Sequence, residues 1–259
     1  MNIPIVNLDS SQVIDIAQKA GNAIMEIYNR DFDIYEKSDN SPLTEADLAS
    51  HKVIVKSLEE LTPDLPVLSE ESFQEEIQNR MSWQTYWLID PLDGTKEFIK
   101  KNGEFTVNIA LVHQNKVIFG VVDAPALELT YWGGKSLGSY KIDNGFERPI
   151  VVAKKKFKTS DMNIVGSRSH QSKEFVKFVE GYPGASIVSM GSSLKLCLVA
   201  EGFADLYPRL GLTSEWDTAA AQAIVEGAGG SVVSLKNNLP LKYNTKSNTL
   251  LNAHFLVTN

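Results

Sequence analysis

The stretch Trp87-Leu88-Ile89-Asp90-Pro91-Leu92-Asp93-Gly94-Thr95 decides the fold around it. Its apolar beginning, residues 87–89, predicts a buried strand. Pro91 lacks an N–H group and fixes φ, so we expect the strand to stop there and the chain to turn. Asp90 and Asp93 would then face the same side, and two carboxylates about 4 Å apart repel by roughly 4 kcal/mol at a surface-like dielectric. A cation between them, or a proton on one of them, would relieve that repulsion.

The next residues favour a phosphate ligand. Gly94 permits a close approach of the backbone. Residues 95–98 predict the first turn of a helix, whose free N–H groups suit an anion. We therefore expect a metal ion beside a phosphate at this turn. An Asx-turn at a strand end, common for Asp-Pro, explains the same residues without any ligand.

The composition is that of a globular protein, with 43% hydrophobic and 22% charged residues among 259. The net charge is −7 and no basic stripe is visible, so a nucleic acid polymer is not an expected partner. The single cysteine, Cys197, excludes an internal disulfide and fits a reducing compartment. The histidines lack zinc-ligand spacing. We recognise neither a signal peptide nor a bilayer-spanning stretch, so stable membrane insertion is not expected.

The first half predicts two helices and then an antiparallel meander. Apolar residues at helical spacing between positions 13 and 27 predict a helix capped by Ser10 or Ser11. Thr44 is the expected N-cap of a second helix, whose predicted buried stripe is Leu48, Val55, Leu58 and Leu61. The gaps after residue 105 are too short for crossover helices. Meander strands are therefore expected at 105–112, 117–122, 129–132, 136–142 and 149–152.

The second half alternates between strand and helix patterns, which predicts a layered α/β arrangement. Strands are expected at 163–165, 187–189, 204–207, 231–234 and 250–251, and helices at 174–179, 194–201 and 218–227. No linker is long enough to split the chain. We therefore expect one domain over residues 1–259, with an α+β half at about 1–155 and an α/β half at about 156–259.

Two further acidic positions lie beside predicted element ends. Glu70 and Glu71 follow the short apolar pair 67–68, an arrangement like that of Asp90, although a solvated acidic loop is the alternative. Asp217 opens the alanine-rich helix, where it could serve only as an N-cap. Together with the two aspartates of the first stretch, these carboxylates form a hard oxygen donor set that suits Mg²⁺ and does not suit zinc.

Three segments resemble the motifs of the inositol monophosphatase superfamily. The members of this superfamily are magnesium-dependent, lithium-sensitive phosphatases. They are Glu70-Glu71, residues 90–95, and Trp216-Asp217 followed by Gly229-Gly230. They stand in the order of the family, and the resemblance covers nearly the whole chain. It implies a five-layer αβαβα sandwich and two or three Mg²⁺ ions as cofactor.

Other segments are similar to the bacterial 3′(2′),5′-bisphosphate nucleotidase branch of that superfamily, namely 166–170, 191–195, 200–202 and 207–209. The resemblance implies removal of the 3′-phosphate from adenosine 3′,5′-bisphosphate to give AMP and phosphate, a reaction of sulfur metabolism. The branch usually has Gly-Pro-Thr where this chain has Gly211-Leu212-Thr213. Loss of that rigid proline would loosen the loop but removes no ligand.

By matching position, the resemblance implies five metal ligands, which are Glu70, Asp90, the Leu92 carbonyl, Asp93 and Asp217. Asp90 would bridge two ions, with Glu70 and Leu92 on the first and Asp93 and Asp217 on the second. One ion would lower the pKa of a bound water to make a nucleophile, and the other would stabilise the leaving oxygen. Among these ligands, Glu70, Leu92, Asp93 and Asp217 are therefore also expected to bind the substrate.

The resemblance also implies catalytic roles for Thr95, Asp47 and Glu70. Thr95 would orient the attacking water and Asp47 would support Thr95, although Asp47 is equally explained as the acidic member of a capping box. The N–H groups of Gly94 and Thr95 would hold the transferred phosphate.

Contacts to the rest of the nucleotide are expected from the second half. Ser169 and His170 follow a predicted strand, and His170 could stack on or hydrogen-bond a base, with a surface histidine as the alternative. Lys195 and Arg209 are candidates for the 5′-phosphate, and the arginine fork suits bidentate contact. Ordinary solvated charges are the alternative for both.

Two other functions stay open at this point. One is an inositol or sugar monophosphatase with the same metals, against which segments 166–170 and 207–209 argue. The other is a metal-dependent nucleotide-binding regulator without turnover, against which the intact Asp47, Thr95 and Glu70 argue. The expected partner is a small nucleotide bisphosphate, and no oligomeric state is predicted. The expected location is cytoplasmic, and the resemblance allows loose attachment to the inner face of the membrane.

Overall fold

The computed structural model describes residues 9–36, 42–72, 79–154, 158–168 and 172–259. The first half forms α1 (Ser10–Tyr28), β1 (Ile34–Glu36), β2 (Pro42–Thr44), α2 (Glu45–Leu61), β3 (Val67–Ser69), β4 (Thr85–Asp93), α4 (Thr95–Ile99), β5 (Thr106–His113), β6 (Lys116–Ala124), β7 (Leu129–Gly134), β8 (Gly138–Asp143) and β9 (Phe146–Ile150). The second half forms β10 (Asn163–Ser167), α5 (Lys173–Val179), β11 (Ser186–Met190), α6 (Leu194–Ala200), β12 (Leu206–Arg209), α7 (Ala219–Gly227), β13 (Ser231–Ser234) and β14 (Phe255–Thr258). The predicted boundary between the halves, at about residues 155 and 156, lies outside the described residues.

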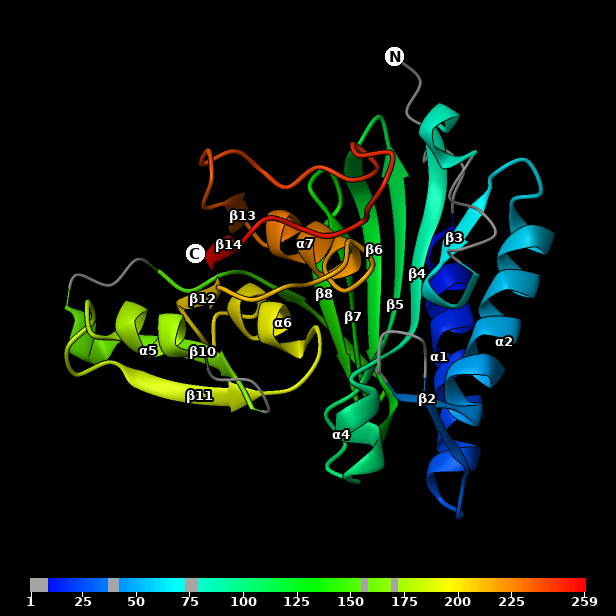
Figure 1. Ribbon diagram of the computed structural model, residues 1–259, viewed down its shortest axis with the longest axis horizontal. Helices are drawn as coiled ribbons and strands as arrows, with labels where there is room; N and C mark the ends of the chain where they lie inside the picture. Colours follow the sequence, from blue (N-terminus) through cyan, green and yellow to red (C-terminus); the bar gives the residue numbers. More distant parts are fainter. Residues whose placement is uncertain (1–8, 37–41, 73–78, 155–157, 169–171) are drawn as a thin grey trace.

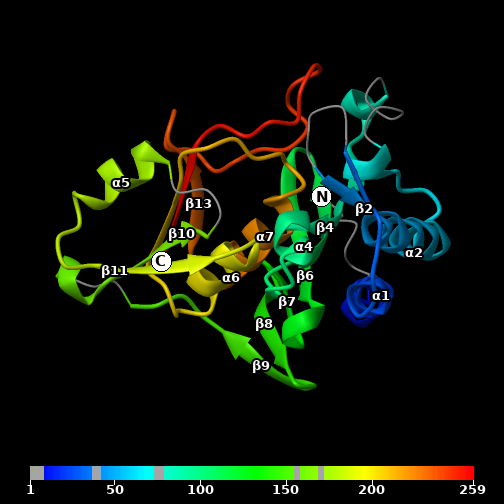
Figure 2. The same ribbon diagram turned by 60° about the horizontal axis from the view of Figure 1, so that its bottom comes forward.

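Helices and sheets alternate in five layers (Figure 1). Helices α1 and α2 cover one face of a seven-stranded sheet with the order β3-β4-β5-β6-β7-β8-β9. Helices α6 and α7 lie between this sheet and a five-stranded sheet with the order β11-β10-β12-β14-β13. Helix α5 lies on the outer side of the second sheet, and the turned view keeps this succession (Figure 2). The predicted αβαβα arrangement is confirmed.

Within the described residues, three hydrophobic cores follow from this layering: a small one joins α5 to the second sheet, and two large ones lie on the two faces of the first sheet. One large core joins α1 and α2 to the first sheet and includes Ile24, Trp87 and Phe105. The other large core joins the opposite face of that sheet to α6, α7 and the second sheet, and it includes Cys197 and Phe255. Strand β4 contributes alternate residues to both large cores, which is the arrangement expected of a strand covered on both faces. The strand that carries the first motif is therefore held rigidly from both sides.

The predicted meander is confirmed, because β4 to β9 pair antiparallel in sequence order. Two strand predictions are wrong. The last meander strand runs over Phe146–Ile150 instead of 149–152, and Leu251 forms only an isolated bridge with Ser214. The strand in that region is β14, which pairs antiparallel with both β12 and β13 and so completes the second sheet.

Two helix predictions also need correction. The N-cap of α1 is Asp9, whose carboxylate accepts from the backbone N–H of Ser11 at 3.0 Å, so neither predicted serine caps the helix. In α2 the predicted N-cap Thr44 is confirmed, but Leu48 is 40% exposed and does not belong to the buried stripe. The buried face of α2 includes polar Asp47 instead.

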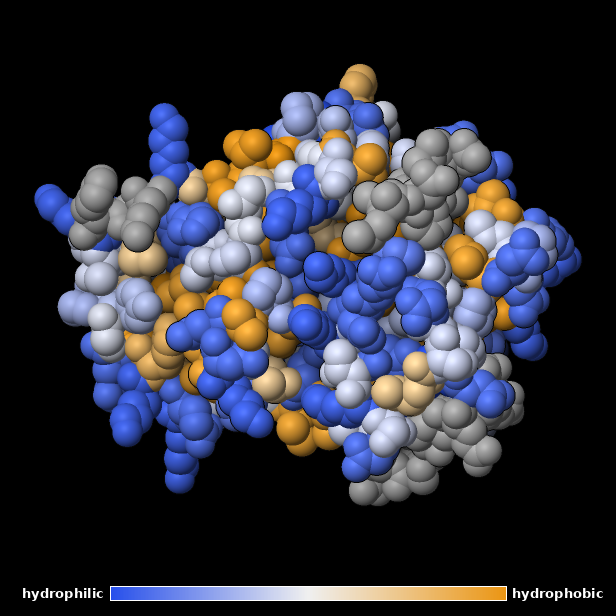
Figure 3. All heavy atoms as spheres, turned by 90° about the horizontal axis from the view of Figure 1, so that it is seen from above, coloured by the Kyte–Doolittle hydropathy of each residue, from blue (hydrophilic) through white to orange (hydrophobic). Residues whose placement is uncertain are grey.

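The α-helices of the described ranges are 5 to 19 residues long. None of the helices found there combines the length and the apolar character needed to cross a membrane. The face seen in Figure 3 shows hydrophobic side chains in several separate groups among hydrophilic ones.

Candidate active site

A β-bulge brings Asp90 and Asp93 to the same side of β4. The prediction that the strand stops at Pro91 is wrong: β4 continues to Asp93. Asp90 pairs with Asn108 of β5 and Asp93 pairs with Thr106. An advance of three residues along β4 therefore corresponds to an advance of only two residues along β5. Residues three apart in a regular strand point to opposite faces, and the extra residue cancels this difference. Pro91 has no N–H for the ladder, which explains why the irregularity lies there.

Strand β3 places Glu70 beside this bulge. It runs parallel to β4, with Ser69 opposite Ile89, so the next residues of both strands leave the sheet at the same edge. Glu70 begins a short 3₁₀ helix over Glu70–Ser72 and lines the same cavity as Asp90. The alternative of a solvated acidic loop is therefore not supported for Glu70.

Asp217 reaches the cavity from the second half. Helix α7 starts at Ala219 and its N-cap residue is Thr218, so Asp217 is not a helix cap. One carboxylate oxygen of Asp217 accepts from the backbone N–H of Ser214 at 2.9 Å. This bond fixes the side chain in the turn before α7 and leaves it lining the cavity.

These elements enclose a cavity of about 440 Å³ between the two halves. Its wall includes most of the predicted site residues, which are Glu70, Asp90, Leu92, Asp93, Gly94, Thr95, Lys195, Arg209 and Asp217. A volume of this size suits a small organic ligand. The predicted Ser169 and His170 lie outside the described residues.

The carboxylates in the cavity repel one another. Burial raises the pKa of Asp90 well above its usual range, and the nearby charges of Glu70, Asp93 and Asp217 raise it further. Burial and the charge of Asp93 likewise raise the pKa of Asp217. For Asp93 burial also raises the pKa, but Lys195 and the hydroxyl of Ser193 oppose that rise. The acidic end of the cavity therefore favours a bound cation.

The donor chemistry fits a hard divalent cation, because every expected ligand is a carboxylate or carbonyl oxygen. Asp90 is only 1% exposed, and its buried charge calls for a counter-ion. Within the described ranges, no three of the His, Cys, Asp and Glu side chains are placed to hold one ion together. Asp90, Asp93 and Asp217 line one cavity together.

Asp47 serves two partners with its two oxygens. Oδ2 accepts from the N–H and the hydroxyl of Thr44, both at 2.7 Å, which forms a capping box at the start of α2. Oδ1 accepts from the hydroxyl of Thr95 at 3.3 Å. The carboxylate of Asp47 therefore caps α2 and also hydrogen-bonds to the Thr95 hydroxyl.

Helix α2 presents a continuous polar face to the site. Ser50 donates to the carbonyl of Pro91 at 2.7 Å, and His51 Nδ1 lies 2.8 Å from the hydroxyl of Ser69. These two residues follow Asp47 by three and four positions, which puts all three on one side of the helix. The face therefore contacts both strand ends that carry carboxylates. The spacing is visible in the sequence, but a search for apolar stripes passes over it.

Ser193 is a site residue that sequence reasoning missed. Its hydroxyl lies 2.9 Å from Oδ2 of Asp93 and 2.6 Å from the carbonyl oxygen of Asp217, and it accepts from Nδ2 of Asn108 at 2.9 Å. It therefore joins the two acidic segments of the cavity. The signal that could have found it is the run 191–195, which in the sequence supports only the resemblance.

The cavity wall also carries two basic side chains, Lys195 and Arg209, which we call its basic end. Lys195 is buried, its ammonium donates to the carbonyl of Ser192 at 2.5 Å, and burial lowers its pKa to about 8. Arg209 donates through Nη2 to the carbonyl of Leu212 at 2.6 Å. Its Nε is buried and has no hydrogen-bond partner among the described residues. Leu212, which stands in place of the usual proline, therefore anchors the arginine through its backbone.

Comparison with known proteins gives consistent results. The model of the inositol monophosphatase family matches residues 9–259. The 3′(2′),5′-bisphosphate nucleotidase CysQ of Salmonella typhimurium is 46% identical over 249 residues, which are 95% of this chain and 98% of that protein. The crystal structure of CysQ from Bacteroides thetaiotaomicron superposes with a TM-score of 0.83 at 40% identity, covering 96% of each chain. The structure of inositol monophosphatase from Anabaena superposes with a TM-score of 0.73 at 26% identity, covering 96% of this chain and 89% of the other.

Proposed function

The chain belongs to the inositol monophosphatase family, and from that premise we propose that it is a magnesium-dependent 3′(2′),5′-bisphosphate nucleotidase. Its substrate would be adenosine 3′,5′-bisphosphate, and its products AMP and phosphate. One observation supports this choice above the others: a single cavity has an acidic end and a basic end. A substrate with two phosphates fits both ends, whereas an inositol monophosphate has only one phosphate to place.

We propose that Glu70, Asp90, the Leu92 carbonyl, Asp93 and Asp217 hold two or three Mg²⁺ ions. When bound, the ions supply an activated water and stabilise charge on the leaving oxygen. The carboxylates of Asp90, Asp93 and Asp217 then bind cations and no longer repel the phosphate.

The remaining catalytic roles fall to groups at the turn after β4. Thr95 would orient the attacking water through its hydroxyl, whose proton is held by Asp47. The backbone N–H groups of Gly94 and Thr95 would hold the transferred phosphate, and Gly94, at φ 96°, adopts the left-handed conformation that favours glycine.

The second phosphate would bind at the basic end. Lys195 supplies a charge and the unpartnered Nε of Arg209 supplies a donor already fixed in direction. We also propose a cytoplasmic location for this activity, which the single buried cysteine supports because such a location does not require disulfides.

A substrate panel tests the proposal. Phosphate release from adenosine 3′,5′-bisphosphate, AMP and inositol 1-phosphate is measured with Mg²⁺ and with chelator. The expected result is magnesium-dependent release from the bisphosphate alone. Preference for inositol 1-phosphate would replace the proposal by the monophosphatase alternative. Binding of the bisphosphate without turnover would replace it by the regulator.

A further inference from the structure

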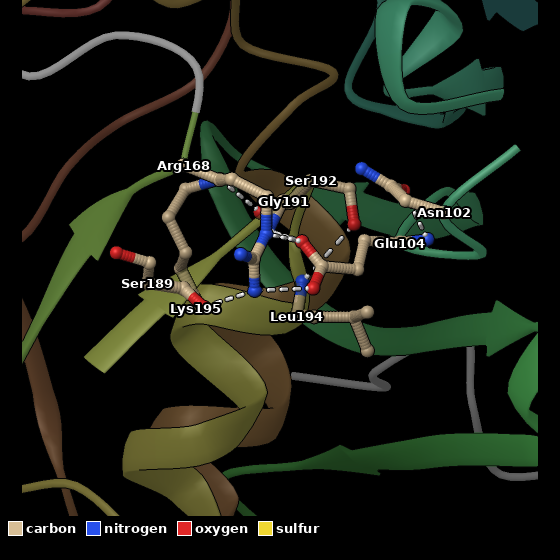
Figure 4. Close-up of polar contacts among 8 residues, drawn as sticks. All are labelled: Asn102, Glu104, Arg168, Ser189, Gly191, Ser192, Leu194 and Lys195. Carbon is tan, nitrogen blue, oxygen red and sulfur yellow. Dashed lines mark hydrogen bonds and ion pairs between the residues drawn. The ribbon is translucent and has the colours of Figure 1, made fainter. Parts of the chain in front are cut away.

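Arg168 and Glu104 join the two halves beside the cavity. Arg168 follows β10 in the second half, and Glu104 lies between α4 and β5 in the first half. Nε and Nη2 of Arg168 donate to the two carboxylate oxygens of Glu104, each at 2.7 Å (Figure 4). Nη2 also donates to the carbonyl of Ser189 in β11 at 2.8 Å. One guanidinium therefore ties two neighbouring strand ends of the second sheet to the first half.

The same carboxylate holds the turn before α6. Oε2 of Glu104 accepts from the backbone N–H of Gly191 at 2.8 Å. The fit is tight, because a Cβ atom on Gly191 would come within 2.6 Å of the Glu104 carbonyl oxygen. The same carbonyl oxygen lies 3.2 Å from the Cβ position of Gly94. Glu104 is thus packed between the glycine turns that open the two ends of the cavity.

The position of Gly191 matters because the next residues of the chain contact both ends of the cavity. Ser192 has φ 45°, an uncommon value for a residue with a side chain, and its carbonyl accepts from Lys195. Ser193 then contacts Asp93. Any shift of Gly191 would displace the lysine at the basic end and the serine that contacts an acidic residue.

Neither member of the ion pair lines the cavity itself. The Arg168 side chain is 46% exposed and that of Glu104 is 13% exposed. A half-exposed ion pair typically adds at most about 1 kcal/mol of stability, with bidentate pairs the more stabilising ones. The bidentate geometry instead provides directional precision, which a lysine could not reproduce. The contacts therefore indicate a role in placing the turn more than a role in holding the fold.

We propose that Glu104 and Arg168 are positioning residues, which hold the turn 191–195 against the Gly94 turn so that Lys195 meets the second phosphate. This inference rests on the proposed function. It extends that function to residues outside the cavity wall and assigns them no contact with substrate.

A double-mutant cycle tests the inference with Glu104→Ala, Arg168→Ala and the double variant. Each single change is expected to raise KM for adenosine 3′,5′-bisphosphate about tenfold, with kcat altered less than about threefold, because a displaced turn weakens binding. The double variant should be no worse than Glu104→Ala alone, since that variant already removes both the ion pair and the bond to Gly191. Arg168→Lys keeps the charge but not the fork, and its KM should lie in between.

A second ion pair between the halves provides the matched control. Lys141 of β8 binds Glu201 at the far end of α6, at 2.8 Å. Lys141→Met should lower the melting temperature and leave KM unchanged. The inference is overturned if the Arg168 variants behave like this control, or if the two single effects add in the double variant. Failure of the proposed function looks different, because the wild type itself would then release no phosphate from the nucleotide. In that case the double-mutant cycle would be repeated with the substrate that the wild type does hydrolyse, and KM for that substrate would be compared.

Discussion

The hydroxyl of Thr95 donates to Oδ1 of Asp47 over 3.3 Å, while Oδ2 of the same carboxylate is held by Thr44. One side chain thus begins a helix and directs the proton of a cavity hydroxyl. The cap fixes the carboxylate in place, and the carboxylate leaves the oxygen of Thr95 facing the cavity as an acceptor. This arrangement allows an aspartate in a capping box also to fix the direction of a cavity hydroxyl.

Asp47→Asn should lower kcat about 10²-fold, because the amide group cannot accept hydrogen bonds at both ends and the Thr95 hydroxyl loses its fixed direction. Phosphate release at saturating Mg²⁺ and substrate measures this effect. Loss of the capping box should also lower the free energy of unfolding by about 1 kcal/mol.

Thr44→Ala separates the two roles of Asp47. It removes the hydroxyl that caps α2 but keeps the bond between Asp47 and Thr95, so stability should fall while kcat is retained. Equal losses of kcat in both variants would show that only the helix end matters.

The sequence predicts the layers well because they follow from local patterns. Alternating apolar residues with short gaps leave no choice but an antiparallel meander, and β4 to β9 form it. The bulge at Pro91 is different, because a proline indicates an interruption of the ladder but not whether the strand resumes. Pairing of Asp93 with Thr106 resolves this, and it depends on the neighbouring strand.

The site was predictable where its residues lie in one motif and not where distant segments meet. The contact of Ser193 with Asp93 spans 100 positions and leaves no periodic signal. Leu48 shows the opposite error, because its helical spacing predicts a core position, whereas its side chain is exposed. The inward face of α2 is instead set by the turn after β4, whose Thr95 bonds to Asp47, so Asp47 is buried and Leu48 is not.

Ser193→Ala should weaken Mg²⁺ binding by about tenfold, because groups that orient metal ligands typically account for 10–100-fold in affinity. Its hydroxyl contacts both Asp93 and the backbone of Asp217. The Mg²⁺ dependence of phosphate release measures the change. Ser192→Ala is the matched control, since its hydroxyl bonds only to the nearby N–H of Leu194 at 3.5 Å among the described residues. An unchanged Mg²⁺ requirement in the Ser193 variant would remove this residue from the metal site.

Asp90→Asn should stabilise the metal-free protein and abolish activity. Burial and like charges raise the pKa of Asp90, so its ionised form destabilises the fold until a cation binds. The neutral amide should increase the free energy of unfolding in chelator by about 1–3 kcal/mol. Mg²⁺ should raise the melting temperature of the wild type by mass action and have little effect on the variant. A variant that still responds to Mg²⁺ like the wild type would contradict the assigned ligand.

Lys195→Met should distinguish the two ends of the cavity. Removing the buried ammonium should raise KM for adenosine 3′,5′-bisphosphate by about 10- to 100-fold, as expected for a charge-assisted contact to phosphate. The Mg²⁺ requirement should not rise, because the positive charge of Lys195 interacts with Asp93 and its removal cannot weaken the binding of a cation there. If KM is unchanged and only stability falls, the lysine is a structural charge.

Asp123 gives a prediction for stability that is independent of the site. It is 4% exposed, and burial raises its pKa to about 6, although the hydroxyl of Thr130 donates to Oδ1 at 2.7 Å and opposes the rise. The unfolded carboxyl has its ordinary pKa of about 3.9. Between these two values the folded state binds more protons than the unfolded state, so stability falls as pH rises from about 4 to about 6.

Asp123→Asn should remove this loss, because the amide keeps an acceptor for Thr130 and cannot ionise. A difference of about two pKa units corresponds to at most about 3 kcal/mol, which the variant should gain at pH 7.5 and largely lack at about pH 4. Chemical denaturation of both proteins at the two pH values measures the gain. The substitution is isosteric, so a packing effect would be the same at both. A gain that does not grow with pH would therefore show that the carboxyl of Asp123 does not titrate in this range in the folded protein.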